Sequence, residues 1–246
     1  MQRARTEARG DTALVLVAAG DSSRMGLVDG ARKPFADLLG RTMIERAAEA
    51  FASSERVAEI VVVAQLEDHA RVIELAQSGG PLARLTAVVA GGKRRADSVL
   101  AGVEATSPER TLVAVHDAAR PLIDAETVAR ALDAAAEQGA ALVAERVVDT
   151  IKRSTDGARA EETLDRNELW AAQTPQVFRR EELCAWFARA DEEGFSPTDD
   201  AALCERYRGP VPIVEGTPTN FKLTTPHDLE LARALLAQRE QGAEAS

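Results

Sequence analysis

Short apolar runs, rich in β-branched residues, alternate along this 246-residue chain with longer amphipathic stretches. An unbroken apolar run is typical of a strand buried on both faces of a parallel sheet, and amphipathic stretches are typical of the helices that cover it. The runs predicted as strands are Ala13–Val17, Glu59–Ala64, Arg84–Val89, Thr111–His116, Ala140–Ala144 and Val211–Val214. The stretches predicted as helices are Thr42–Ala52, Leu66–Ala76, Asp97–Glu104 and Asp124–Glu137. This alternation predicts an α/β fold with a doubly wound, mostly parallel sheet, whose ligand site lies at the carboxyl ends of the strands.

Residues 147–170 break the alternation. Val147–Arg153 alternates in side-chain character, a polar segment follows, and Thr163–Trp170 is again extended in character. This pattern predicts a β-hairpin arm that projects from the sheet. Two strands cannot bury their own faces, so the arm needs a partner, and we expect a homodimer whose subunits exchange arms. An arm that folds down over its own domain is the alternative.

We expect one domain over residues 11–237. It is flanked by a disordered amino-terminal arm at residues 1–10 and a disordered, polar tail at residues 238–246. Thr225 and Pro226 are suited to the N-cap and first position of the last helix. Residues 198–200 are similarly interpreted as a helix N-terminus, with an N-cap and first-turn acids.

The net charge of −10 argues against a broad nucleic-acid or anionic-membrane surface, because both partners are negatively charged. A local basic pocket could still hold a small polyanion. No apolar run approaches the ~20 residues that span a bilayer. Cys184 and Cys204 lie on predicted helices without metal-ligand spacing, which suggests structural thiols in a reducing compartment. We therefore expect a cytoplasmic protein that binds neither nucleic acid nor membrane.

The first predicted strand runs directly into Ala18-Ala19-Gly20, and the loop that follows carries Arg24 and Lys33. Small residues let backbone N–H groups approach an anion closely, and the two cations can neutralise it. The loop matches neither G-x-x-x-x-G-K-[ST] nor G-x-G-x-x-G. It is a candidate phosphate-binding loop, with an ordinary strand-to-helix turn and solvated basic residues as the alternative.

Two further predicted strands end in unusual residues. The third leads into a glycine pair followed by Asp97 and Ser98, and the fourth leads into Asp117 and Arg120. Each has an ordinary explanation, since Asp97 or Ser98 could cap a helix and Asp117 and Arg120 could form a surface ion pair. However, loops that follow parallel strands converge on one crevice, so polar residues placed there repeatedly indicate a site.

No nucleophile with a partnered base emerges. Ser22 and Ser23 lack a G-x-S-x-G context, and the three histidines form no metal-ligand set. What remains is a group of fixed cations, including Lys222, around a glycine loop, with Asp117 as a possible metal contact. Such an inventory suits phosphoryl or nucleotidyl transfer, where positioning and charge neutralisation supply most of the catalysis.

The motifs also resemble those of a known family. They are Ala18-Ala-Gly…Arg24-Met…Lys33-Pro, Gly91-Gly…Arg95-Ala-Asp-Ser98-Val, Val115-His-Asp-Ala-Ala-Arg-Pro121, Asp149-Thr-Ile-Lys152, Asp165-Arg-Asn167…Leu-Trp170, Gln173-Thr-Pro-Gln176 and Asn220-Phe-Lys222. Together they resemble the 2-C-methyl-D-erythritol 4-phosphate cytidylyltransferases, from about Leu14 to Leu236. The resemblance implies a Rossmann-like nucleotidyltransferase that makes an isoprenoid precursor from CTP and methylerythritol phosphate, with Mg²⁺ and as a homodimer.

The resemblance implies a role for each matching residue. Stabilisation of the charge at the α-phosphorus falls to Arg24 and Lys33, and positioning of the methylerythritol phosphate falls to Arg166 and Lys222. The implied CTP-binding residues are Ala18, Ala19, Gly20, Gly92, Asp97, Ser98 and Ala118. The implied substrate-binding residues are Asp117, Arg120, Thr150 and Thr174. Thr150 lies on the arm, which in the family reaches the neighbouring subunit's site, and Mg²⁺ is held by CTP phosphates with Asp117 as a possible ligand.

Two other functions stay open. One is a cytidylyltransferase of the same fold that accepts ribitol 5-phosphate, because inspection of the sequence does not settle acceptor choice. The other is a non-catalytic nucleotide-binding regulator. Retention of all four implied catalytic cations disfavours the regulator.

Overall fold

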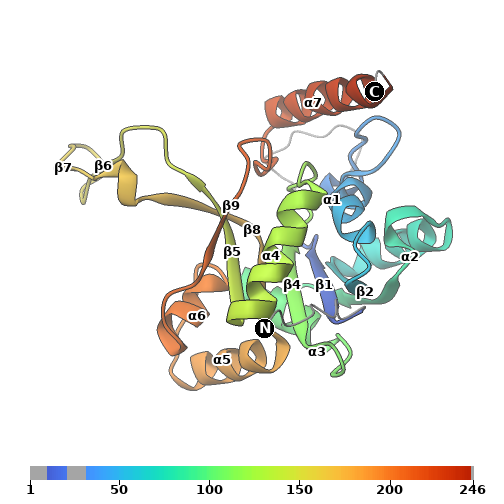
Figure 1. Cartoon of the computed structure of the whole chain (residues 1–246), viewed down its shortest axis with the longest axis horizontal. Coiled ribbons are helices and arrows are strands. Elements are labelled where there is room, and N and C mark those ends of the chain that lie inside the picture. Colours follow the sequence, from blue (N-terminus) through green and yellow to red (C-terminus); the bar gives the residue numbers. More distant parts are fainter. Residues whose placement is uncertain (1–9, 21–31, 245–246) are drawn as a thin grey trace, which may run out of the picture.

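A sheet of seven strands, in the order β3-β2-β1-β4-β8-β5-β9, forms the centre of the molecule (Figure 1). The structure is a computed structural model and describes residues 10–20 and 32–244. The strands are β1 (Thr12–Val17), β2 (Val57–Ala64), β3 (Leu85–Ala90), β4 (Leu112–Asp117), β5 (Ala140–Arg146), β8 (Trp170–Arg179) and β9 (Ile213–Glu215). All neighbours pair in parallel except β8, which is antiparallel to both β4 and β5. The predicted doubly wound, mostly parallel sheet is confirmed.

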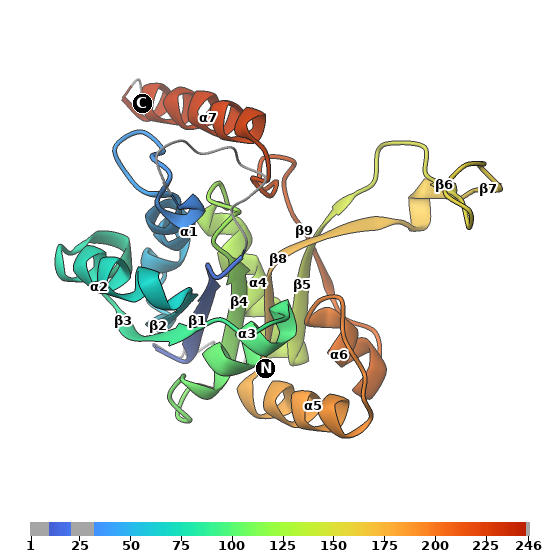
Figure 2. The same cartoon turned by 180° about the vertical axis from the view of Figure 1, so that it is seen from behind.

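Helices cover both faces of this sheet. They are α1 (Met43–Ala52), α2 (His69–Gln77), α3 (Arg95–Glu104), α4 (Ala125–Gln138), α5 (Arg180–Glu192) and α6 (Ala201–Tyr207). Leu14 and Leu16 of β1 belong to the core shared with α1 and α4, whereas Ala13 and Val15 belong to the core shared with α3 and α5. This alternation is the period-two geometry of a strand buried on both faces. Helix α4 lies in front of the sheet in Figure 1, and α3 lies in front of it in Figure 2.

Strand β8 is the main departure from the predicted pattern. It lies inside the sheet, where Phe178 is in register with Val113 of β4 and with Ala140 of β5. Its centre holds the buried polar side chains of Gln173, Thr174 and Gln176. The sequence of β8 therefore contains no apolar run from which a strand could be predicted. Its polar side chains are hydrogen-bonded only when the sheet has formed. The predicted helical positions of Cys184 in α5 and Cys204 in α6 are confirmed.

The predicted projecting hairpin is present. Strands β6 (Lys152–Arg153) and β7 (Glu162–Thr163) pair antiparallel in a sheet of their own. Figures 1 and 2 both show them at the tip of an arm that extends from the ends of β5 and β8, away from the helices. Val148, on this arm, is 73% exposed. The described chain thus leaves apolar surface uncovered on the arm.

Helix α7 (Pro226–Glu244) begins as predicted, with Thr225 Oγ1 accepting the N–H of Asp228 (3.2 Å). Its residues Leu229 and Leu236 pack with Leu38 in a third apolar cluster. Residues 238–244, part of the tail that was expected to be disordered, continue the helix. Arg239 donates there to the carbonyl of Leu122 (3.1 Å), and Glu240 accepts from Arg46 (3.1 Å). Residues 1–9 of the expected amino-terminal arm lie outside the described residues. No helix among the described residues is both long and apolar enough to cross a membrane.

Candidate functional site

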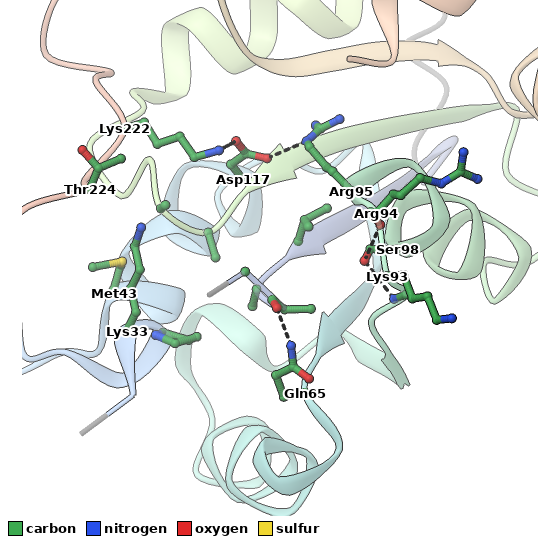
Figure 3. Close-up of a pocket in the computed structure, with 18 residues that line it drawn as sticks. Lys33, Met43, Gln65, Lys93, Arg94, Arg95, Ser98, Asp117, Lys222 and Thr224 are labelled. Atoms are coloured by element: carbon green, nitrogen blue, oxygen red, sulfur yellow. Dashed lines mark hydrogen bonds and ion pairs between the residues drawn. The ribbon is translucent and has the colours of Figure 1, made fainter. Parts of the chain in front are cut away.

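A cavity of about 380 Å³ opens at the carboxyl edge of the sheet, where β1, β3 and β4 end (Figure 3). The loops after these strands line it, together with η2 (Lys33–Phe35) and the segment before α7. Five basic side chains lie among its described lining residues: Lys33, Lys93, Arg94, Arg95 and Lys222. Asp117 is the one acidic side chain among them. In a chain of net charge −10, this local excess of positive charge indicates an anion site.

The loop after β1 presents small residues to the cavity. The N–H of Ala18 donates to the carbonyl of Val63 (2.7 Å), and the carbonyl of Ala19 accepts from the side-chain amide of Gln65 (2.6 Å). Apart from Gly20 and its two chain neighbours, no described residue has a heavy atom within 4 Å of the place where a Cβ on Gly20 would stand. The start of the predicted phosphate-binding loop is therefore anchored at its back and open toward the cavity. Arg24, on its continuation, lies outside the described residues.

The loop after β3 is packed tightly on the first turn of α3. A Cβ on Gly92 would stand 2.4 Å from Cβ of Asp97, so this position requires glycine. The N–H of Gly92 donates to Oγ of Ser98 (3.0 Å), and Ser98 lines the cavity. Asp97 instead accepts from the side chain (3.0 Å) and the backbone N–H (3.1 Å) of Arg94, and both hydrogen bonds lower the pKa of its carboxyl. Asp97 thus caps α3, which was the ordinary alternative for this residue.

Asp117, at the end of β4, lies between two cations. Its Oδ2 accepts from Nζ of Lys222 (2.7 Å), and its Oδ1 accepts from Nε of Arg95 (3.3 Å) (Figure 3). Burial alone would raise the pKa of the Asp117 carboxyl, but the charges of Arg95 and Lys222 outweigh burial and lower it to about 2. The carboxylate is therefore ionised at neutral pH, and it fixes two of the cations that line the cavity.

Arg95 has a second acidic partner, because its Nη1 donates to Oδ2 of Asp200 (2.9 Å). The Asp200 side chain is 1% exposed, and burial raises its pKa to about 6 despite the nearby Arg95 charge. Burial would lower the pKa of Arg95, yet the two carboxylates raise it. Sequence reasoning gave neither residue a role: Arg95 stood in a motif without a function, and Asp200 was interpreted as part of a helix N-terminus.

His116 and Thr174 form a buried support behind Asp117. Oγ1 of Thr174 accepts the N–H of Asp117 (3.1 Å) and lies 2.9 Å from Nδ1 of His116. Nε2 of His116 lies 3.1 Å from the carbonyl of Arg120. A neutral imidazole satisfies all three contacts if the Thr174 hydroxyl donates to Nδ1 and Nε2–H donates to that carbonyl. Thr174, implied as a substrate-binding residue, is buried here, and together with His116 it supports both ends of the loop 117–120.

Arg120 bonds the backbone of two distant segments. Its guanidinium donates to the backbone carbonyls of Asn220 (2.7 Å) and Ala172 (3.4 Å), and it is absent from the described cavity lining. The surface ion pair with Asp117 is wrong, since Asp117 is buried and its described ion pairs are with Arg95 and Lys222. Arg120 ties the loop after β4 to the segment that carries Lys222.

Nine of the residues implied by the motifs meet at this one cavity. They are Ala18, Ala19, Gly20, Lys33, Gly92, Ser98, Asp117, Ala118 and Lys222. Thr150 and Arg166 lie on the arm, where Nη1 of Arg166 donates to the carbonyl of Val148 (2.7 Å), and neither lines the cavity of its own chain. Among the polar lining residues, Gln65, Lys93, Arg94, Arg95 and Thr224 were not predicted. The basic run after the glycine pair was the available signal for Lys93, Arg94 and Arg95.

The protein side chains at this cavity suit a metal ion only if phosphate groups supply further ligands. The described residues hold no group of three or more His, Cys, Asp or Glu side chains that could bind a metal. Asp117 offers one carboxylate, and both of its oxygens face cations. Mg²⁺ is commonly held by one or two carboxylates together with substrate phosphates and water. The donor set fits Mg²⁺ bound in that way and does not fit an ion held by protein alone.

Comparison with known proteins gives a consistent result. The family model described as 2-C-methyl-D-erythritol 4-phosphate cytidylyltransferase matches residues 12–238. A protein of that name from Solibacter usitatus is 41% identical, over 94% of this chain and 97% of its own. The crystal structure of the enzyme of that name from Thermus thermophilus is 35% identical, with a TM-score of 0.71 and coverage of 90% of this chain and 97% of its own. A 4-diphosphocytidyl-2C-methyl-D-erythritol synthase structure from Anaerococcus prevotii has a TM-score of 0.80 at 26% identity, covering 92% and 96%.

We expect the buried imidazole of His116 to make the fold sensitive to acid. Burial lowers the pKa of His116 to about 4, below its ordinary value of 6.5, so the unfolded chain binds this proton first as the pH falls. Between pH 6.5 and pH 4 the group should remove about 3 kcal/mol from the free energy of unfolding. His116→Gln should have a lower free energy of unfolding than wild type at pH 7. This difference between the two proteins should shrink by about 3 kcal/mol at pH 4. Urea unfolding at several pH values in this range measures the difference.

His227→Gln removes an exposed histidine and controls for the loss of a histidine as such. A gap between His116→Gln and wild type that stays constant with pH would show that His116 is not held neutral by burial.

Proposed function

Because the chain belongs to the 2-C-methyl-D-erythritol 4-phosphate cytidylyltransferase family, we propose that it transfers CMP from CTP to 2-C-methyl-D-erythritol 4-phosphate. The products are 4-diphosphocytidyl-2-C-methyl-D-erythritol and pyrophosphate. The observation that carries the proposal is the convergence of five basic side chains on one glycine-lined cavity. Two polyanionic substrates must meet there, and fixed cations offset their repulsion.

The transfer forms one bond and breaks one. An oxygen of the acceptor phosphate attacks the α-phosphorus of CTP, and the bond from that phosphorus to the bridging oxygen of pyrophosphate breaks. A phosphate monoester is already anionic at neutral pH, so no general base is required. The task left to the chain is to place the two anions and neutralise the charge that builds up between them. Lys33, Lys222 and Arg95 provide fixed positive charge at the cavity for this purpose, and we assign Arg24 to the same task.

We also propose Mg²⁺ as the cofactor. Asp117 is the described side chain that would hold it, alongside the phosphates of CTP. When bound, the ion would neutralise charge on the departing pyrophosphate. The free cysteines Cys184 and Cys204 support a proposed location in the reducing cytoplasm.

The arm supports a homodimer in this proposal. Thr150 and Arg166 are implied as substrate-handling residues, yet both lie on the arm, which extends away from the helices (Figure 2), and neither lines the cavity of its own chain. An arm that reaches the cavity of a second copy would give both residues a place in a site. It would also cover the exposed Val148.

Lys33→Ala should lower kcat by a factor on the order of 10² to 10³, while CTP binding is largely kept. The charge at the α-phosphorus grows in the transition state, so a cation that neutralises it acts more on the rate than on ground-state binding. A pyrophosphate-release assay gives kcat, and calorimetric titration gives the CTP affinity. Arg189→Ala, which removes an exposed guanidinium on α5, should keep the wild-type values. Near-normal turnover in Lys33→Ala would remove the charge-stabilising role.

Mixed dimers test where the arm acts. Lys33→Ala damages the body of a subunit and Arg166→Ala damages its arm, and each variant alone should be nearly inactive. If arms are exchanged, a mixed dimer contains one site built from an intact body and an intact arm. Equal mixing with free exchange of subunits should then restore about a quarter of wild-type turnover. No recovery, with mixed dimers demonstrated by differently tagged chains, would place the arm over its own subunit.

A further inference from the structure

Asp200 is a buried acid at the start of α6 that does not serve the helix it precedes. Its side chain makes no capping hydrogen bond to α6. The backbone N–H groups at the start of α6 donate to two other side chains. Oδ1 of Asp199 accepts from Ala202 (3.1 Å), and Oε1 of Gln176 accepts from Ala201 (2.8 Å). The helix N-terminus therefore does not account for a carboxylate at position 200.

The one described side chain that Asp200 engages is Arg95. Its Oδ2 accepts from Nη1 of Arg95 (2.9 Å), and its Oδ1 is buried without a hydrogen-bond partner among the described residues. Stability does not account for this acid either. Burial holds the pKa of Asp200 near 6, above the unfolded value of 3.8, so its contribution to stability is present at low pH and is lost as the pH rises through 6. An ionised Asp200 therefore lowers the stability of the fold at neutral pH, and a role in activity is the remaining explanation for it.

Arg95 faces the cavity from α3 and has acids on two sides. Figure 3 shows the Nε edge of its guanidinium joined to Asp117, which also accepts from Lys222. The four groups form the series Asp200, Arg95, Asp117 and Lys222, joined at 2.9, 3.3 and 2.7 Å. A guanidinium released by Asp200 could turn both of its donor edges onto Asp117 and compete there with Lys222. Asp200 holds Arg95 away from that arrangement.

We propose that Asp200 is a positioning residue for nucleotidyl transfer: it draws the Arg95 guanidinium to the side of the cavity, so that Asp117 remains shared between Arg95 and Lys222. This inference rests on the proposed function, because it gives Asp200 a task in that reaction. Asp200 touches neither substrate in this account and acts through Arg95 alone.

The test is Asp200→Asn, which keeps the size and one acceptor oxygen of the side chain but loses its charge. The ratio kcat/KM for CTP should fall on the order of tenfold to a hundredfold, as small misplacements of catalytic groups do. The urea midpoint at pH 7.5 should stay equal to that of wild type or rise. Asp199→Asn, the neighbouring acid that does not reach Arg95, should keep wild-type kcat/KM. In an Arg95→Gln background, adding Asp200→Asn should have little further effect, because the pair acts as one unit.

Wild-type kcat/KM in Asp200→Asn overturns the proposal. A variant that fails to fold, or that loses stability in step with activity, also overturns it by showing a structural role. An equal loss of kcat/KM in Asp199→Asn also overturns the proposal. So does a result in which the effects of Asp200→Asn and Arg95→Gln on kcat/KM are fully additive. If the wild-type chain itself releases no pyrophosphate from CTP with methylerythritol phosphate, the proposed function fails, and that result is distinct from each of these.

Discussion

The arrangement of the site depends on the ion pairs of Asp117 with Arg95 and Lys222. They join the end of β4 to the start of α3 and to the segment before α7, which are far apart in the sequence. A carboxylate buried at this depth loses much of its hydration, and two cations at hydrogen-bond distance replace it. Loss of either cation would leave the buried carboxylate with one described ion-pair partner instead of two, and loss of the carboxylate would leave Arg95 paired with Asp200 alone. The contacts that offset the lost hydration of the Asp117 carboxylate therefore also fix the positions of two cations.

These fixed cations explain how an acidic protein can bind anionic substrates. The chain carries a net charge of −10, yet the cavity at the carboxyl edge of the sheet has five basic side chains and one acidic side chain among its described lining residues. The surface charge and the cavity charge thus serve different needs, solubility and substrate binding. The proposed reaction requires no general base, because the attacking phosphate group is already an anion.

Local sequence signals predicted the parts of the site that depend on local geometry. Small residues after an apolar strand, a glycine pair before a helix and polar residues after the fourth strand all lie at one edge, because parallel strands bring their carboxyl ends together. Gly92 shows how specific such a signal is, since any side chain there would meet Asp97. What the sequence did not reveal depends on contacts between distant segments. The pairing of Arg95 with Asp200 spans more than a hundred residues, and an acid before a helix has the same local pattern whether it caps the helix or not.

Strand β8 and residue Arg120 show the same limit. The buried polar residues of β8 give no apolar run, so the strand becomes evident only through its pairing with β4 and β5. The guanidinium of Arg120 bonds two backbone carbonyls of segments that follow it by about fifty and a hundred residues. In both cases the partner that decides the role is remote in sequence. The extension of helix α7 also has remote partners, since Arg239 donates to the carbonyl of Leu122 and Glu240 accepts from Arg46.

The central claim is that the cavity brings CTP together with one phosphorylated acceptor. Steady-state pyrophosphate release, measured with CTP and Mg²⁺ and with either 2-C-methyl-D-erythritol 4-phosphate or ribitol 5-phosphate, tests it most directly. The account predicts release that depends on the acceptor, with a much higher kcat/KM for the methylerythritol phosphate. A preference for ribitol 5-phosphate, or no release with either acceptor while CTP still binds, would contradict it.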